Sequence, residues 1–245
     1  MTTIEPLRTL IIGPSTKHSA TVILMHGLGD SGHGWYPFVD QFKEDQSLSH
    51  INWILPHAPT LPVTANMGMR MPAWFDVEDF GFKAREDEAG MMKTVYSIGR
   101  LLTEEIDAGI PAGRIVIAGF SQGGAMTVLT GLTTERPVAG LAVMSGWAPL
   151  HDKLKAMCTD HARRLPIFWG HGKSDPLVKY QLGAESVEFL KNELGIRGAP
   201  SDATDAASLR GLSFHSYPNL GHSTNQKELD DLRGWLKKVL PKVTP

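Results

Sequence analysis

Short apolar runs alternate with longer amphipathic segments along this chain, and this alternation restricts the fold more than any other feature. Runs such as residues 21–27 and 114–120 are almost continuously apolar, as strands buried on both faces are. Strands that alternate with helices predict an α/β fold with a mostly parallel central sheet and helices on both faces. The expected strands are residues 9–13, 21–27, 52–59, 114–120, 140–147, 165–172 and 212–218, and the expected helices are about 35–44, 84–108, 122–132, 178–194 and 224–239.

The length of the chain suits one unit of this kind, because 245 residues can bury a large core without disulfides or metals. No linker divides the sequence, which predicts a single domain over residues 1–245. The segment 197–211 is small, polar and bounded by glycine and proline, so we expect a flexible surface loop there. The net charge of -2 and the scattered lysines and arginines argue against nucleic acid as a partner.

The stretch GFSQGG, residues 119–124, places Ser121 directly after an apolar run and before a helical pattern. Gly119, Ser121 and Gly123 fit the pattern G-x-S-x-G, which alone arises by chance too often to decide anything. A position between a strand and a helix is what this pattern requires when its serine is a nucleophile on a strained turn. We therefore predict that Ser121 is a catalytic nucleophile rather than an ordinary turn serine.

A serine nucleophile needs a histidine base and an acid that orients the base, and in this type of fold the chain order is serine, acid, histidine. His222 lies in a glycine-marked loop beyond the last expected strand, whereas His215 lies within that strand. Asp175 follows the strand before the histidine strand, and Asp152 follows the one before that. We predict Asp175 as the acid and His222 as the base, because loops at strand ends can reach the nucleophile. Asp152 is the alternative acid, and His215 is interpreted as structural.

Attack on a carbonyl group creates an oxyanion, which backbone N–H groups must stabilise. One donor is expected from Gln122, the residue after the nucleophile. The second is expected from a loop after an earlier strand, and the glycine-rich segment 26–35 fits that place. This segment lacks the patterns of a nucleotide-phosphate loop, and His26 and His33 have no H-E-x-x-H motif or cysteine partner. We therefore expect no metal and no bound nucleotide at this segment, and we interpret both histidines as loop-ordering residues.

Six stretches spread over nearly the whole chain make the sequence similar to a known family. They are LMHGLGDSGHGW, LPHAP, MPAWFD, GFSQGGAM, GHGKSDPLV and LGHS. The chain closely resembles the acyl-protein thioesterase/carboxylesterase family of α/β-hydrolases, which are small cytosolic serine hydrolases that also act as lysophospholipases. The resemblance implies that Ser121, Asp175 and His222 form the catalytic triad and that the backbone amides of Leu28 and Gln122 hold the oxyanion. It also implies hydrolysis, without a cofactor, of thioesters that join fatty acyl groups to protein cysteines.

The resemblance makes S-acylated proteins the expected substrates. In the alternative of a carboxylesterase or lysophospholipase, they are small esters or lysophospholipids. The chain departs from the family in two places. Members that are themselves lipidated carry a cysteine near the N-terminus, whereas this sequence begins Met1-Thr2-Thr3. The segment 197–211 also looks longer than the family usually has.

An acyl chain needs an apolar groove beside the nucleophile. The segment NMGMRMPAWF, residues 66–75, alternates methionines and ends on aromatic residues, and methionine adapts to flexible apolar ligands. We expect Met67, Met69, Met71 and Trp74 to line the acyl site. The alternative is a loop packed on the core.

Cys158 is the only cysteine, so no disulfide can form within the chain. Together with the lack of a secretory signal, this favours a reducing compartment. No apolar stretch approaches the ~18 residues that a membrane span needs. We expect a cytoplasmic, or cytoplasmic and nuclear, protein that meets membranes peripherally and transiently. An apolar site mouth would also support a weak homodimer.

Overall fold

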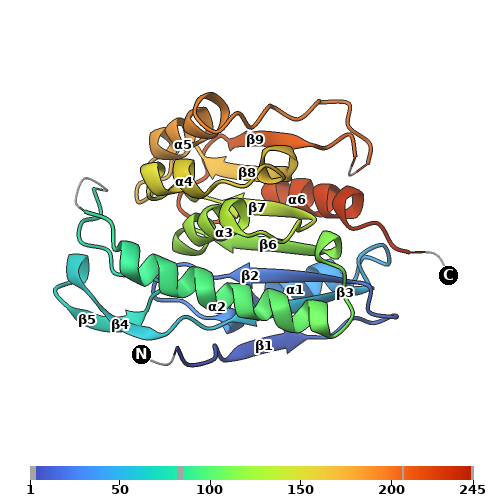
Figure 1. Cartoon of the computed structure of the whole chain (residues 1–245), viewed down its shortest axis with the longest axis horizontal. Coiled ribbons are helices and arrows are strands. Elements are labelled where there is room, and N and C mark those ends of the chain that lie inside the picture. The colour runs from blue at the N-terminus through green and yellow to red at the C-terminus, as the bar shows by residue number, and fades with distance from the viewer. Residues whose placement is uncertain (1–3, 82–84, 206, 244–245) are drawn as a thin grey trace.

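The computed structural model describes residues 4–81, 85–205 and 207–243, and a seven-stranded sheet forms its centre (Figure 1). The strands are β1 (Thr9–Ile12), β2 (Ala20–Met25), β3 (Ile51–Pro56), β6 (Ile115–Phe120), β7 (Gly140–Met144), β8 (Pro166–Gly172) and β9 (Gly211–Tyr217). Their order across the sheet is β1-β3-β2-β6-β7-β8-β9. β1 is antiparallel to β3, and the other neighbouring pairs are parallel. The carboxyl ends of the parallel strands therefore meet at one edge of the sheet, where α/β proteins bind ligands.

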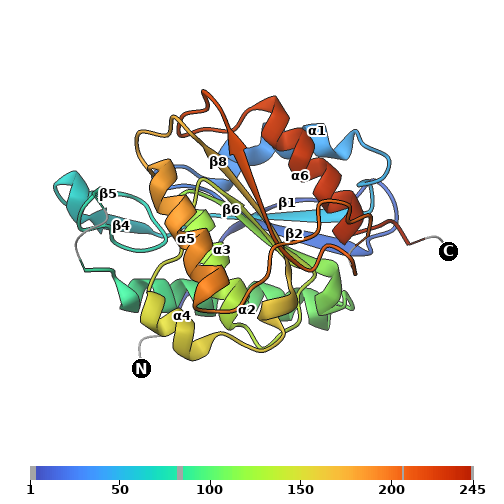
Figure 2. The same ribbon diagram turned by 90° about the horizontal axis from the view of Figure 1, so that it is seen from above.

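The α-helices divide between the two faces of this sheet (Figure 2). They are α1 (Tyr36–Lys43), α2 (Glu88–Asp107), α3 (Gln122–Thr133), α4 (His151–Met157), α5 (Tyr180–Asn192) and α6 (Gln226–Val239). Buried side chains of α2, α3, α4 and α5 pack on one face, and those of α1 and α6 pack on the other. The predicted fold, a mostly parallel sheet with helices on both faces, is confirmed.

The two cores explain why the central strands are almost continuously apolar. In β6, Ile115 and Ile117 point into the core under α2 to α5, while Val116 and Ala118 point into the core under α1 and α6. Successive side chains of a strand point to opposite faces, so a strand covered on both sides needs apolar residues throughout.

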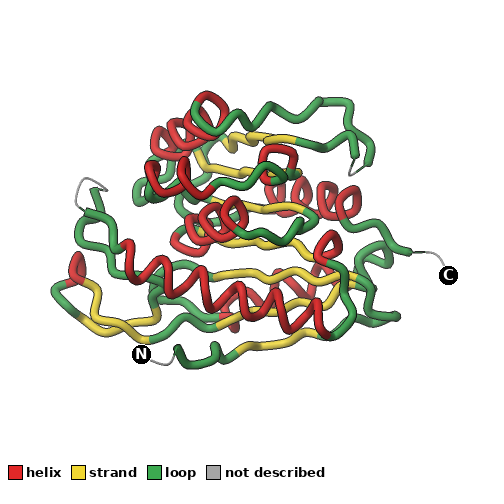
Figure 3. Tube along the Cα trace, in the orientation of Figure 1, coloured by secondary structure: helices red, strands yellow, loops and turns green. Residues whose placement is uncertain are grey.

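Two features of the fold were not expected from the sequence. One is the helix α4, which is too short for its apolar spacing to stand out. The other is a small antiparallel hairpin outside the main sheet, formed by β4 (Thr60–Val63) and β5 (Met69–Pro72) (Figure 3). Its strands are joined by a 3-10 turn, one of four short 3-10 segments in the described residues: Gly32–Trp35, Thr64–Asn66, Ala112–Arg114 and Ala162–Arg164.

The described part of the segment 197–211 runs along the outer edge of the sheet. The Ala199 amide donates a hydrogen bond of 3.0 Å to the carbonyl of Leu212 in β9. The side chains of Ala203 and Leu209 are buried against the α1 and α6 core. These contacts tie the segment to the sheet at several points. Its flexibility, like the single-domain organisation of residues 1–245, stays a prediction.

The helix α6 carries a buried carboxyl group, Glu228, for which the described part of the chain provides no ion pair. The Glu228 side chain is fully buried, and neither of its oxygen atoms has a hydrogen-bond partner among the described residues. It lies against Gly170, where an added Cβ would overlap with the carboxyl group. Burial, and then the nearby Asp231, raise the pKa of Glu228 to about 8. The folded protein therefore holds a proton that an unfolded chain releases near pH 4.5.

This carboxyl group predicts a pH dependence of stability with a definite sign. The folded state binds one more proton than the unfolded state between about pH 4.5 and 8, so the free energy of unfolding falls as the pH rises through that window. Glu228→Gln should remove this loss, so the variant gains on the wild type by ~3 kcal/mol from pH 5 to pH 8. Urea unfolding at several pH values measures the difference. The exposed Glu44→Gln is the control, and equal pH dependence in all three proteins would contradict the prediction.

Candidate active site

Ser121 lies on the sharp corner between β6 and α3. Its backbone has φ 55° and ψ -119°, a left-handed conformation that costs energy for a residue with a side chain. The Ser121 amide donates to the carbonyl of Met144 in β7 at 2.9 Å, and its carbonyl accepts from Ala125 in α3 at 3.0 Å. These bonds hold the corner from both sides, so the surrounding structure maintains the strain.

The two glycines of the G-x-S-x-G pattern are required by close backbone packing. A Cβ at Gly119 would overlap with the carbonyl oxygen of Gly123, and a Cβ at Gly123 would overlap with that of Met25 at the end of β2. The corner can therefore form only where both side chains are absent.

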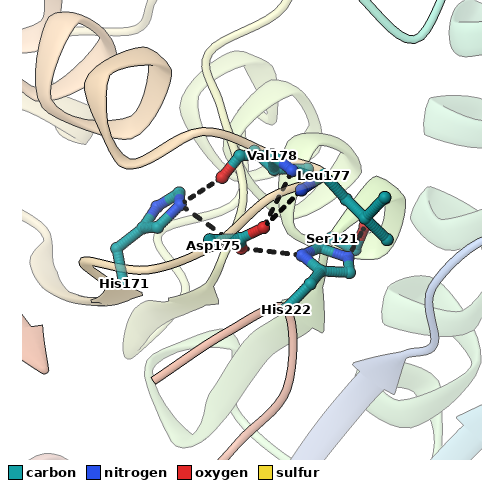
Figure 4. A network of polar contacts seen from close by, with 6 residues as sticks. All are labelled: Ser121, His171, Asp175, Leu177, Val178 and His222. Atoms are coloured by element: carbon teal, nitrogen blue, oxygen red, sulfur yellow. Dashed lines mark hydrogen bonds and ion pairs between the residues drawn. The ribbon is translucent and has the colours of Figure 1, made fainter. Parts of the chain in front are cut away.

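The structure brings Ser121, His222 and Asp175 into one hydrogen-bonded series (Figure 4). The Ser121 hydroxyl lies 2.9 Å from Nε2 of His222, and Nδ1 of His222 lies 2.8 Å from Oδ2 of Asp175. The carboxylate accepts a hydrogen bond from Nδ1–H and so leaves Nε2 unprotonated and free to accept the hydroxyl proton, which is the arrangement a general base needs. The three residues come from the loops that follow β6, β8 and β9.

The loop after β8 holds Asp175 by its own backbone. The amides of Leu177 and Val178 donate to Oδ1 of Asp175 at 2.9 Å and 3.0 Å, so Oδ2 is left to face His222. The neighbouring His222 loop is joined to it because the Ser174 amide donates to the Leu220 carbonyl at 3.0 Å. The acid and the base are thus positioned by two loops that pack directly on each other.

The alternative acid and histidine are placed elsewhere. Asp152 is exposed in the first turn of α4. His215 lies in β9 and stacks on Phe168, with the ring centroids 4.8 Å apart. Its partly buried ring faces the α1 and α6 core, in agreement with a structural role.

The two residues predicted to supply the oxyanion donors, Leu28 and Gln122, lie far apart in the sequence but in the same pocket. Leu28 and Gln122 both line the pocket beside Ser121, and neither amide donates a hydrogen bond within the described residues. The Gln122 side chain joins this corner to the segment that carries Trp74 and Phe75. It accepts from the Trp74 amide and donates to the Phe75 carbonyl, both at 2.8 Å. The role of Leu28 and Gln122 as oxyanion donors remains a proposal.

His26 orders the loop that carries Leu28. Its Nδ1 donates to the Gly27 carbonyl at 2.7 Å, and its Nε2 accepts from the Ala58 amide at 3.0 Å. Burial lowers the pKa of His26, which keeps the ring neutral and able to do both. The loop-ordering interpretation of this histidine agrees with these contacts.

A pocket of about 320 Å³ opens beside Ser121 and His222. Apart from the catalytic groups and Asp30, its wall is apolar. The apolar side chains are those of Leu28, Val77, Phe80, Phe120, Trp147, Leu177 and Val178. Sequence reasoning missed Val77, Phe80 and Leu177, because single apolar residues in loops carry no periodic signal.

The methionine segment does not form this pocket. Met67 and Met69 lie at the tip of the β4–β5 hairpin with exposed fractions of 88% and 51%, and Met71 packs on the core from the hairpin's inner side. Trp74 is buried, and its indole N–H donates to the His26 carbonyl at 2.8 Å. The expectation that these four residues line the acyl site therefore needs correction. Met69 and Met71 are two residues apart on β5 and so share one face of the ribbon. Met71 meets the core, whereas Met69, at the tip, is exposed.

The remaining sequence expectations concern Cys158 and metal or membrane association. Burial raises the pKa of the Cys158 thiol, which disfavours the thiolate that a nucleophile requires. Over the described ranges, no group of three or more histidine, cysteine or acidic side chains is arranged to hold a metal ion. In the same ranges, no helix combines the length and apolar character needed to cross a bilayer.

Ser121 has a positive backbone φ on a strand–helix corner, and its acid and its histidine follow it in that order along the chain. These features define a serine hydrolase of the α/β-hydrolase fold. The sequence matches the Phospholipase/Carboxylesterase family over residues 8–240, and the chain belongs to that family.

Relatives and solved structures agree with this assignment. The chain is 46% identical over 237 residues to acyl-protein thioesterase 1 of Cryptococcus neoformans var. neoformans serotype D, a match that covers 96% of this chain and 98% of the relative. The crystal structure of SOBER1 from Arabidopsis thaliana superposes with a TM-score of 0.80 at 34% identity, covering 91% of this chain and 99% of that one. Acyl-protein thioesterase 2 from Zea mays gives a TM-score of 0.78 at 31% identity, with 95% and 99% covered. The predicted fold, family and enzyme class, a hydrolase, are confirmed.

Proposed function

We propose that this chain cleaves thioester bonds between fatty acyl groups and protein cysteines through an acyl-enzyme intermediate. The observation that carries the proposal is the hydrogen-bonded series from Ser121 through His222 to Asp175 in the wall of an apolar pocket. The series supplies a nucleophile and its base, and the pocket suits a hydrocarbon chain. The names of the relatives, acyl-protein thioesterases among them, support a thioester substrate.

The first half of the reaction forms the acyl-enzyme. His222 Nε2 takes the hydroxyl proton as Ser121 Oγ attacks the thioester carbonyl carbon, and the amides of Leu28 and Gln122 stabilise the resulting oxyanion. The carbon–sulfur bond then breaks, and His222 returns the proton to the leaving thiol. Asp175 holds the imidazole in the tautomer that accepts at Nε2 and stabilises the imidazolium.

The second half releases the fatty acid. A water molecule takes the place of the thiol, His222 accepts its proton, and the water oxygen attacks the acyl carbon. Collapse of the second tetrahedral intermediate returns the proton to Ser121 Oγ and frees the carboxylic acid. No cofactor takes part in either half of this scheme.

The second candidate is a carboxylesterase or lysophospholipase, which the description of the matching family favours. Both candidates use the same chemistry, so only kinetics separates them. We expect kcat/KM for a palmitoyl-cysteine peptide to exceed the values for lysophosphatidylcholine and a short p-nitrophenyl ester. A higher value for the lysophospholipid would favour the second candidate. Failure of a fluorophosphonate probe to label the protein, with or without detergent, would point instead to a catalytically silent scaffold.

The composition of the pocket wall predicts which residues contact a long acyl chain. Phe80→Ser combined with Leu177→Ser should lower kcat/KM for a palmitoyl substrate about tenfold, because two large apolar contacts are lost. The value for an acetyl or butyryl ester should stay within about twofold, since a short chain does not need those contacts. The matched control is Met69→Ser on the hairpin tip, which should affect neither substrate. A loss confined to Met69→Ser would restore the methionine hypothesis.

Peripheral membrane contact belongs to the same proposal. Phe80 and Leu177 at the pocket mouth are 50% and 60% exposed, and the hairpin adds Met67 and Met69 to the apolar surface. The hairpin is joined to the oxyanion loop because the Gly29 amide donates to the Pro72 carbonyl at 2.8 Å. Exposed apolar patches favour contact with lipid or with a second copy. Vesicle sedimentation tests the first, and sedimentation velocity tests the weak homodimer.

The proposed substrates also imply where the protein works. S-acylated cysteines on the cytoplasmic side of membranes would place it in the cytoplasm, or in the cytoplasm and nucleus, with transient visits to the bilayer. Imaging of a tagged protein together with fractionation tests this part of the proposal.

A further inference from the structure

Ser121, His222 and Asp175 form the catalytic relay of the proposed reaction. The buried imidazole of His171 lies next to Asp175 and has no part in the reaction steps given above. His171 lies in β8, four residues before Asp175, and its side chain is completely buried. It packs against α5, where a Cβ at Gly183 would overlap with its Nδ1 and where the Tyr180 ring meets it edge-on at 5.8 Å. The glycine in α5 therefore makes room for a histidine at this place.

The contacts of His171 determine its protonation. Nε2 lies 2.8 Å from the Val178 carbonyl oxygen, which can only accept, so Nε2 carries the proton. Nδ1 is buried and has no partner within the described residues. Burial lowers the pKa of His171, although the hydrogen bond to Val178 and the charge of Asp175 act in the opposite direction. His171 is therefore a neutral imidazole that donates one hydrogen bond, from Nε2 to the Val178 carbonyl.

Val178 connects His171 to Asp175, because it forms a hydrogen bond with each of them. The Val178 carbonyl accepts from His171, and the Val178 amide donates to Oδ1 of Asp175 at 3.0 Å. The His171 Nε2 also lies 3.7 Å from Oδ2, the oxygen that faces His222. Figure 4 shows the two imidazoles on opposite sides of the carboxylate. Val178 therefore links the His171 ring to the carboxylate that faces His222.

We propose that His171 is a positioning residue of the catalytic relay, whose Nε2–H anchors the Val178 carbonyl and thereby fixes the Asp175 carboxylate against His222. This inference rests on the proposed function, since it assigns to His171 a task within that relay. The groups that face His171 are Asp175, Tyr180 and, beyond the carboxylate, His222. Backbone hydrogen bonds such as that from the Ser174 amide to the Leu220 carbonyl hold the start of the turn, whereas the bond from His171 holds the Val178 carbonyl at its end.

Two substitutions separate this role from simple core packing. Gln places its amide N–H near the position of His Nε2, so His171→Gln keeps a donor toward Val178. Phe fills the volume of the ring without any donor, so His171→Phe keeps the packing and removes the hydrogen bond. The control is His215→Phe, because His215 is a partly buried histidine on the next strand that stacks on Phe168 away from the relay.

The experiment measures the second-order rate of fluorophosphonate labelling and the downfield proton resonance of the hydrogen bond between His222 and Asp175. In His171→Phe, we expect labelling to slow by about 10- to 100-fold, because a misplacement of about 1 Å in the catalytic groups has that effect. The resonance should broaden or vanish. In His171→Gln, both should return toward the wild type, and His215→Phe should leave both unchanged.

Two results would overturn the inference. One is labelling within about threefold of the wild type together with an intact resonance in His171→Phe. The other is an equal loss in His171→Gln and His171→Phe, because a donor at the right place would then have no value. If the wild type itself is not labelled, the proposed function fails, and the resonance alone still decides whether His171 fixes the pair of Asp175 and His222.

Discussion

Replacing Ser121 with alanine should lower kcat by about 10⁴- to 10⁶-fold and should abolish covalent labelling, because no other group can take the place of Oγ. The loss is not expected to come from unfolding. The backbone bonds from Ser121 to Met144 and Ala125 do not involve the side chain, and alanine carries the same Cβ into the same strained conformation.

The measurement is steady-state turnover of a palmitoyl-cysteine peptide, with the melting temperature recorded for each protein. Ser201→Ala, an exposed serine in the segment 197–211, is the control and should behave as the wild type. The residual rate of Ser121→Ala reports what the pocket and the oxyanion donors achieve without a nucleophile. Turnover within about tenfold of the wild type would mean that the relay described here does not perform the chemistry.

Replacing Asp175 with asparagine is expected to lower kcat by about 10⁴-fold with little change in KM. The amides of Leu177 and Val178 donate to one carboxylate oxygen, so the asparagine oxygen will occupy that place. Its NH₂ group then faces Nδ1 of His222, where two donors would oppose each other. The imidazole must respond by carrying its proton on Nε2, and in that tautomer it cannot accept the proton of Ser121.

The same kinetic assay on Asp152→Asn provides the control, because Asp152 is the alternative acid, which follows the preceding strand. It is exposed on α4, and its neutral variant should keep nearly full activity. The reverse pattern, with activity lost in Asp152→Asn and kept in Asp175→Asn, would refute the assignment of the acid. A binding role for Asp175 would raise KM instead of lowering kcat, so the two constants must be measured separately.

Much of the fold could be predicted because a buried strand or helix requires a pattern of apolar residues that is visible over a short stretch of sequence. Strands covered on both faces, such as β6 and β7, must be apolar at every position, and this is visible over a few residues. α6 shows Leu229, Leu232 and Leu236 at helical spacing, and all three are buried. α4 could not be predicted in the same way, because seven residues give too little periodicity.

In the candidate site, too, the residues with a local sequence pattern could be predicted and the others could not. Ser121 and its glycines could be found because the corner demands a local pattern, and chain order then selected Asp175 and His222. The pocket wall could not be found, since Val77, Phe80 and Leu177 come from separate loops with no shared pattern. The methionine segment misled because alternation in a sequence does not tell which side of a ribbon faces a ligand.

The sequence by itself determined the strand–helix alternation, the glycine-flanked serine and the chain order of acid and base. Each of these follows from a local requirement: burial of a strand, close backbone approach at a corner, or a position just after a strand. Only the tertiary structure decided which residues form the wall of the pocket and that Met67 and Met69 are exposed. It also decided that Glu228 is buried and that His171 contacts Val178, in the turn that follows Asp175. These depend on segments far apart in the chain that meet only when the sheet assembles, so no local pattern could record them.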